Sequence, residues 1–208
     1  LNQTGQIQSQ YHTLVETAPF LDRLGAVTAE FRANEPRSGD VVIATPERLV
    51  LDHVSYSYQG DRLALDDVSF EVTSGETIGL IGPSGSGKST VIQILLRLRH
   101  PDQGHYLLDG VDAAEIEDKS WFDQVAFVPQ ESRLIAGSVA DNIAFFRPDI
   151  TRSAIEDAAK RAHVHEEILA LPQGYETDLG VGGGALSGGQ RQRISIARAL
   201  SVQPRLIV

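Results

Sequence analysis

The stretch from residue 82 to residue 90, which reads Gly-Pro-Ser-Gly-Ser-Gly-Lys-Ser-Thr, constrains this chain more than any other. It matches the pattern G-x-x-x-x-G-K-[ST] through Gly82, Gly87, Lys88 and Ser89. In that pattern, glycines let backbone N–H groups curl inward around a β-phosphate. The lysine adds a charge for the β- and γ-phosphates, and the serine hydroxyl can bind Mg²⁺. The stretch therefore predicts a nucleotide site.

The residues on either side of this loop strengthen the prediction. Residues 76–81, Glu-Thr-Ile-Gly-Leu-Ile, are typical of a short, apolar, buried strand. After the loop, Val91, Ile92 and Leu95 recur at helical spacing, so we expect the loop to lead into a helix N-terminus. The positive end of the helix dipole would then lie under the phosphates. A glycine-rich turn with an incidental lysine is the alternative, and the flanking strand and helix disfavour it.

Composition bounds the remaining possibilities. The chain has 208 residues, enough for one domain with an appendage, and 18 basic against 28 acidic residues give a net charge of −10. It shows no basic stripe, so we expect no nucleic-acid partner.

Without cysteine it has neither disulfides nor thiolate metal sites, and His163 and His165 do not share a helix face. No apolar run reaches the length that spans a bilayer, and because the chain starts at Leu1 we expect a fragment.

The first 40 residues differ from the rest. Apolar residues between Tyr11 and Phe31 fall at amphipathic helical spacing, and Pro19 is expected to bend or split this helix. Residues 34–40 have the composition of a linker. We therefore assign residues 1–40 to a helical linker and residues 41–208 to the main domain.

Strand and helix patterns alternate through the main domain. Strand patterns occur at 48–74, 105–108 and 124–128, with a turn at Asp109-Gly110, and helical patterns at 138–171 and 187–201. This alternation predicts an α/β fold with a largely parallel sheet, a small antiparallel part and a helical insertion. Asp66 and Asp67 would be candidate catalytic carboxylates, but a solvated strand end is the favoured interpretation.

A second motif lies at residues 186–190, Leu-Ser-Gly-Gly-Gln. Ser187 is a favourable N-cap and Gln190 follows at the third helical position, which predicts a capping box. Gly188 and Gly189 leave the entrance of the helix bare, so its N–H groups could face an anion. For a lone motif of this kind, a merely well-capped helix is the favoured interpretation.

Together these motifs resemble the nucleotide-binding domain of ABC transporters, most closely the exporter type, which is fused to a membrane domain. The resemblance runs from about Leu49 to the last residue. The loop at 82–89 is similar to the Walker A motif, and residues 186–190 are similar to the signature motif. Gln130, after Val128-Pro129, is similar to the Q-loop glutamine, which in the family senses Mg²⁺ and the attacking water.

The resemblance implies a P-loop NTPase core of the RecA-like type, with an antiparallel β subdomain and a helical insertion at about 136–186, preceded by the helical linker. It implies ATP and Mg²⁺ as cofactors, with Ser89 and Gln130 as the metal ligands and Lys88 and Gln130 in catalysis. Tyr58 would stack on adenine, as a strand-borne tyrosine can. The other implied nucleotide contacts are Gly82, Ser84, Gly85, Ser86, Gly87, Lys88, Ser89, Thr90, Ser187, Gly188, Gly189 and Gln190.

The exporter resemblance also implies partners and a location. We expect a second ABC nucleotide-binding domain, meeting this one head to tail, and a transmembrane domain of the same chain, at the cytoplasmic face of the plasma membrane. One departure affects that coupling: the family's T-E-V-G-E-R-G stretch corresponds here to residues 177–183, with Val181 and Gly182 replacing its Glu and Arg.

Two alternatives stay open from the sequence. The chain stops at Leu206-Ile-Val208, where the family's Walker B strand begins, so we expect this piece alone to have little ATPase activity and to act as a nucleotide-binding module. A soluble ABC-type ATPase without a membrane domain is the other alternative. The helix at 11–31 and the exporter-like segment at 135–143 argue against it.

Overall fold

The computed structural model describes residues 16–29, 39–58, 62–184 and 186–208. The chain forms two compact units, residues 1–37 and 38–208, and the predicted boundary at residue 40 stays a prediction. In the first unit, residues 16–29 form one exposed helix that runs through Pro19 without a break. Within these residues the helix is therefore not split at Pro19, and the predicted bend stays a prediction. The rest of the predicted helix, and most of the linker, lie outside the described residues.

The second unit begins with an antiparallel sheet, as the sequence predicted. Its strands are β1 (Arg48–Ser57), β2 (Leu63–Thr73), β3 (Gln103–Leu108) and β4 (Val111–Asp112), in the order β2-β1-β3-β4. The turn between β3 and β4 lies at Asp109 and Gly110, whose φ angles are 51° and 83°. Both residues tolerate the left-handed region, so the predicted tight turn is confirmed.

Two helices pack on this sheet and close the first hydrophobic core. They are α2 (Lys88–Leu95) and α3 (Asp118–Phe122), separated from each other by β3, β4 and the short 3₁₀ helix η1 (Ala113–Glu115). Leu51, Val54 and Tyr106 from the strands meet Ile94 and Trp121 from the helices in one buried cluster. Burial of these large apolar side chains holds the start of α2 against the sheet.

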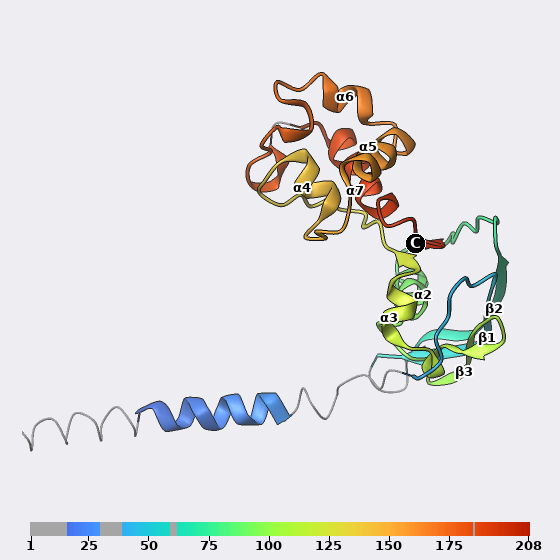
Figure 1. Cartoon of the computed structure of the whole chain (residues 1–208). Helices are drawn as coiled ribbons and strands as arrows, with labels where there is room; N and C mark the ends of the chain where they lie inside the picture. The colour runs from blue at the N-terminus through green and yellow to red at the C-terminus, as the bar shows by residue number, and fades with distance from the viewer. Residues whose placement is uncertain (1–15, 30–38, 59–61, 185) are drawn as a thin grey trace, which may run out of the picture. The chain divides into compact units, whose positions relative to one another are not determined.

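The second core is built mainly from helices, with Leu134, Leu179 and Leu186 contributed by the segments between them. It joins α4 (Val139–Ala144), α5 (Arg152–Arg161), α6 (His165–Leu169) and α7 (Gly188–Leu200), which gather in one lobe in Figure 1. The short 3₁₀ helices η2 (Gly174–Glu176) and η3 (Val181–Gly183) lie between α6 and α7. Ile143, Ile168 and Ile194 are almost fully buried at its centre. The helical patterns predicted at 138–171 and 187–201 are confirmed.

The parallel sheet is smaller than predicted. Its described strands are β5 (Val125–Ala126) and β6 (Leu206–Ile207), which pair in parallel. Residues 76–81 do not form a strand: Ile78, Leu80 and Ile81 are 44%, 39% and 97% exposed. A buried strand needs a neighbouring strand to satisfy its N–H and C=O groups. Within the described residues this segment pairs with no strand, so the prediction of a buried strand here is wrong for the structure.

A buried asparagine connects α7 to the segment that follows Gln130. Asn142 is fully buried, and its amide donates to the carbonyls of Ile135 and Ser138, each at 3.0 Å. Its Oδ1 accepts from the backbone N–H of Ile135 at 2.9 Å and from Nη2 of Arg198 at 3.1 Å. Arg198 also donates from Nε to the carbonyl of Asn142 at 2.8 Å. A buried amide satisfied on both ends fixes the relative positions of these elements.

We predict that Asn142→Ala lowers the free energy of unfolding by about 2–3 kcal/mol, because it leaves buried partners without hydrogen bonds. Urea denaturation followed by circular dichroism measures the change. Gln173→Ala removes an exposed amide and serves as the matched control, expected to change stability by less than about 0.5 kcal/mol. Equal effects of the two substitutions would contradict the assignment of Asn142 as a structural connector.

An irregularity in the antiparallel sheet brings a histidine to an aspartate. His53 and Asp67 both have a φ of 51°, at a register shift between β1 and β2. Nδ1 of His53 lies 2.5 Å from Oδ1 of Asp67, and both side chains are exposed. Asp66 is exposed as well, so the pair is solvated as expected, but both residues lie inside β2 and the expectation of a strand end is wrong.

The hydrogen bond that His53 donates to Asp67, together with the charges of Asp67 and Asp52, raises the pKa of His53 above its usual 6.5. Because the folded-state pKa is the higher one, this pair stabilises the fold fully below about pH 6.5, and the contribution disappears as pH rises through the folded-state pKa. An NMR titration of the imidazole should show the raised value in the parent chain and its return towards 6.5 in Asp67→Asn. An unchanged midpoint in Asp67→Asn would contradict the pairing.

Candidate nucleotide-binding site

The predicted phosphate loop bends sharply where it enters α2. Gly87 is the N-cap of the helix and has a left-handed conformation, with φ 86° and ψ 0°. A Cβ at this position would lie 2.5 Å from the carbonyl oxygen of Ala64 and 2.7 Å from Cδ2 of Leu65, both on β2. Only glycine satisfies both the backbone angle and this close approach. The glycine of the motif therefore also fixes the helix start against the sheet.

The bend leaves donors exposed at the positive end of α2. The N–H groups of Thr90 and Val91 both donate to the carbonyl of Gly87 at 2.9 Å. Within the part of the chain that the structure describes, the N–H groups of Gly85, Gly87, Lys88 and Ser89 have no acceptor. Unpaired N–H groups at a helix N-terminus form a site for anions, phosphate above all.

The lysine of the loop folds back over it. Nζ of Lys88 donates to the carbonyls of Gly82 and Pro83 at 2.9 and 2.8 Å, and lies 3.4 Å from Oγ of Ser86. These neutral acceptors hold the ammonium beside the unpaired N–H groups. An anionic ligand there would offer the ammonium stronger, charge-assisted hydrogen bonds than these carbonyls do.

Tyr58, predicted to stack on adenine, lies at the same site. It lines one surface hollow of about 540 Å³ together with Ala64, Ser84, Gly85, Gly87, Lys88, Ser89 and Thr90. Its hydroxyl lies 3.1 Å from Oγ1 of the buried Thr90 and donates to Oε1 of Gln93 at 3.0 Å. The ring is 47% exposed, so it presents an aromatic surface next to the phosphate loop. The structure thus brings seven of the nine contacts predicted between residues 58 and 90 to one hollow, and the other two, Gly82 and Ser86, contact the lysine ammonium.

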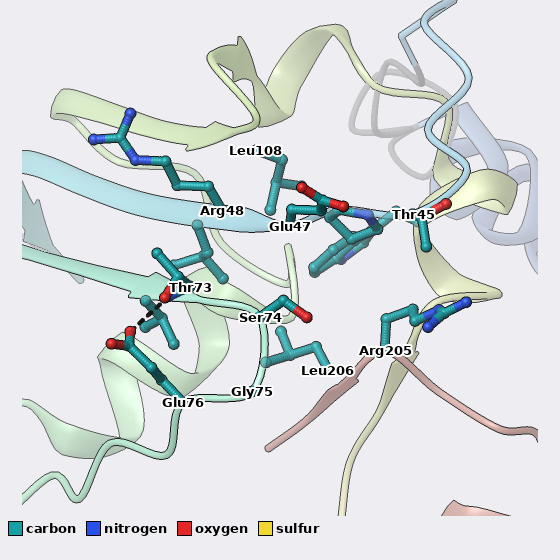
Figure 2. Close-up of a pocket in the computed structure, with 14 residues that line it drawn as sticks. Thr45, Glu47, Arg48, Thr73, Ser74, Gly75, Glu76, Leu108, Arg205 and Leu206 are labelled. Atoms are coloured by element: carbon teal, nitrogen blue, oxygen red, sulfur yellow. Dashed lines mark hydrogen bonds between the residues drawn. The ribbon is translucent and has the colours of Figure 1, made fainter.

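A second hollow is too small for a nucleotide. It measures about 150 Å³ and lies between the start of β1, the turn at 73–76 and β6. Figure 2 shows its lining, including the hydrogen bond of 2.8 Å from the N–H of Thr73 to the carboxylate of Glu76. Small-molecule sites usually have about 300–1,000 Å³. The hollow at Tyr58 falls within that range and this one does not.

Gln130 and residues 187–190 do not line the hollow at Tyr58. Gln130 is exposed, four residues after the end of β5. Residues 188–190 open α7 in the helical lobe, with Ser187 as the N-cap. Within the described residues, no contact joins either group to the phosphate loop.

The start of α7 has the geometry predicted for it. Oγ of Ser187 accepts from the N–H of Gln190 at 3.2 Å, and Oε1 of Gln190 accepts from the N–H of Ser187 at 2.8 Å. This is the capping box, so that prediction is confirmed. The N–H groups of Gly188 and Gly189 have no acceptor among the described residues. The helix therefore presents a second group of unpaired donors to solvent.

The flank of α7 carries charge close to this capping box. Nη2 of Arg193 donates to Glu167 at 2.5 Å, and this hydrogen bond lowers the pKa of the Glu167 carboxyl below its usual value. Nη1 of Arg191 donates to the carbonyl of Leu186 at 2.6 Å. The charge of Arg193 is thus paired with Glu167, whereas Arg191 is bound to a neutral carbonyl beside the helix start.

The ligands available for a metal ion are oxygen donors. The hydroxyl of Ser89 lines the hollow beside Lys88. No group of three or more His, Cys, Asp or Glu side chains that could hold a metal occurs in the described ranges. Mg²⁺ prefers oxygen ligands and completes its shell with water and phosphate oxygens, so a site with one or two protein ligands fits it.

The sequence missed three residues that shape the site. Tyr56, Gln93 and Arg99 contact Tyr58. Two of them had a signal in the sequence: Tyr56 shares a strand face with Tyr58, and Gln93 lies one turn after Thr90 on the same helix. Arg99 had none, since it follows the end of α2 by several residues.

The comparisons with known proteins settle the family. The sequence profile described as "ABC transporter" matches residues 65–208, which is more than half of the chain. The chain belongs to the ABC transporter family. It is 43% identical over 90% of its length to the ABC transporter ATP-binding protein YfiB of Bacillus subtilis. It is also 43% identical over 80% of its length to an ATP-dependent lipid A-core flippase of Saccharophagus degradans.

A solved structure agrees with this assignment. A bacterial Atm1-family ABC exporter, determined with ATP bound, matches 89% of the chain with a TM-score of 0.75 and 37% identity. The chain is thus an ABC ATPase domain of the exporter type, with the α/β fold and antiparallel subdomain that the sequence predicted. It spans about a third of each of these proteins, at 33%, 28% and 34% of their lengths. No helix in the described residues is both long and apolar enough to cross a membrane.

We predict that Gly87→Ala destabilises the chain and weakens nucleotide binding, since the added Cβ meets the backbone of β2 and the angle is unfavourable. The control is Gly110→Ala, which has a similar φ of 83° but open space around the added Cβ, and isolates the backbone cost of about 1 kcal/mol. Urea denaturation should show a loss for Gly87→Ala that exceeds the control by at least about 1 kcal/mol. Equal losses would contradict the role of close packing at this bend.

Proposed function

We propose that this domain binds ATP with Mg²⁺ in the hollow between Tyr58 and residues 84–90, and that ATP binding and hydrolysis drive transport across a membrane. One observation carries the proposal: a single hollow combines an exposed aromatic ring, a lysine ammonium and a run of unpaired backbone donors. The aromatic ring can stack on a purine, and the ammonium and the N–H groups can bind a triphosphate.

Each part of the hollow has a distinct task. Tyr58 stacks on the base, and its hydrogen bonds to Thr90 and Gln93 hold the ring beside α2. The N–H groups of residues 85–89 surround the β-phosphate, and Lys88 exchanges its carbonyl acceptors for β- and γ-phosphate oxygens. Because these donors are fixed by the bend at Gly87 before binding, little reorganisation is needed.

Ser89 and Gln130 are the proposed ligands of Mg²⁺. The ion supplies neutralisation of the charge that develops on the phosphates during transfer. Ser89 is already in the hollow, whereas Gln130 lies outside it. Gln130 therefore has to approach when nucleotide binds, and its place on the irregular segment after β5 is suited to such a movement.

The start of α7 is proposed to act on the nucleotide of a second ABC domain. Ser187 and the unpaired N–H groups of Gly188 and Gly189 do not reach the hollow of their own chain, yet they have the geometry of an anion site. A head-to-tail pair of domains would supply each hollow with the α7 start of its partner. One relative, 41% identical over 77% of this chain, is described as an ATP-binding/permease protein, which supports the proposal of a transmembrane domain in the same chain. The ATP-binding domain would then lie at the cytoplasmic face of the plasma membrane.

The test is calorimetric titration of this chain with ATP and Mg²⁺. We expect saturable binding in the parent chain and a loss of at least about 100-fold in affinity for Lys88→Ala, which removes a charge-assisted contact to phosphate. Lys160→Ala removes an exposed lysine of α5 and serves as the control, expected to bind as the parent does. Unchanged affinity in Lys88→Ala would overturn the proposed site.

A second test separates binding from turnover in the full-length protein. Ser187→Ala should leave ATP affinity unchanged, because Ser187 does not line the hollow of its own chain, but should reduce the rate of ATP hydrolysis at least about tenfold. An ATPase assay alongside the titration measures both. Loss of affinity with unchanged turnover would contradict the proposed action across two domains.

A further inference from the structure

Arg99 contacts two tyrosines, Tyr56 in β1 and Tyr58 just after the end of β1. Its guanidinium carbon lies 5.2 Å from the ring centroid of Tyr58 and 6.0 Å from that of Tyr56. Its Nη1 donates to the hydroxyl of Tyr56 at 3.1 Å. The two rings meet edge to face, with centroids 5.2 Å apart and planes at 88°. Arg99 therefore bridges a buried ring and an exposed one.

These contacts restrict how the Tyr58 ring can turn. The Tyr58 hydroxyl is hydrogen-bonded to Thr90 and Gln93. The Tyr58 ring also contacts Tyr56, which is only 7% exposed, and the guanidinium of Arg99. Arg99 does not line the hollow that Tyr58 shares with the phosphate loop. The cation therefore supports the ring from outside and leaves the surface that lines the hollow for a ligand.

From this geometry we infer that Arg99 is a positioning residue for the nucleobase: it fixes the Tyr58 ring and so favours ligands that carry a base over a bare triphosphate. The inference rests on the proposed function of the hollow. It concerns only the base end of the ligand, since the phosphate end is bound by Lys88 and the backbone of residues 85–89. Loss of Arg99 should therefore affect a nucleotide and an inorganic triphosphate differently.

The experiment compares ATP with inorganic tripolyphosphate, both with Mg²⁺, by calorimetry on this chain. Arg99→Gln should weaken ATP binding about two- to fivefold and leave tripolyphosphate binding unchanged. Arg99→Lys keeps the cation and should recover at least half of the loss. Arg161→Gln, an exposed arginine at the end of α5, makes the same charge change away from the hollow and should alter neither ligand. In a Tyr58→Ala background, Arg99→Gln should have no further effect on ATP.

Three results would overturn the inference. They are equal losses for both ligands, which would make Arg99 a general charge for phosphate; no loss for either ligand; or an undiminished effect in the Tyr58→Ala background. Failure of the proposed function is recognised separately, because then the parent chain binds neither ligand, or Lys88→Ala leaves both affinities unchanged. If Lys88→Ala weakens both ligands and Arg99→Gln weakens neither, only the inference about Arg99 is wrong.

Discussion

The close approach of Gly87 to the carbonyl of Ala64 is the constraint on which the rest of the site depends. It fixes the first turn of α2 against β2, where no side chain has room. The bend leaves the N–H groups of Gly85, Gly87, Lys88 and Ser89 without an acceptor among the described residues, and Lys88 folds back over the loop. The same helix carries Thr90 and Gln93 to the Tyr58 hydroxyl, so the two ends of the hollow are held by one element.

The helical lobe is stabilised by a hydrophobic core of its own. This core positions α7, and the Arg198–Asn142 hydrogen bonds tie that helix to the segment after Gln130. These hydrogen bonds join the last turn of α7, at Arg198, to residues 133–142. Neither Gln130 nor the start of α7 lines the hollow at Tyr58, so the proposed function requires a movement of Gln130 and a second domain for Ser187 to act on.

How far the sequence predicts this molecule depends on whether a feature is local. The capping box at Ser187 and Gln190, the turn at Asp109-Gly110 and the helix after the phosphate loop are each specified by a few neighbouring residues, and the structure has them. The segment 76–81 is apolar enough for a strand, but a strand depends on partners distant in sequence, and in the described residues none pairs with it. Arg99 was missed for a similar reason, since its contact with Tyr58 spans 41 positions and depends on the turn after α2.

The most direct test of the central claim is an amide NMR spectrum of this chain with and without ATP and Mg²⁺. The account predicts the largest changes at the N–H signals of residues 85–90, which lie at the phosphates, together with changes at the ring of Tyr58. The N–H signals of Gly188 and Gly189 should stay unchanged as long as the chain is monomeric, because they do not line the hollow. Saturable ATP binding that leaves residues 85–90 unchanged and alters signals elsewhere would contradict the account.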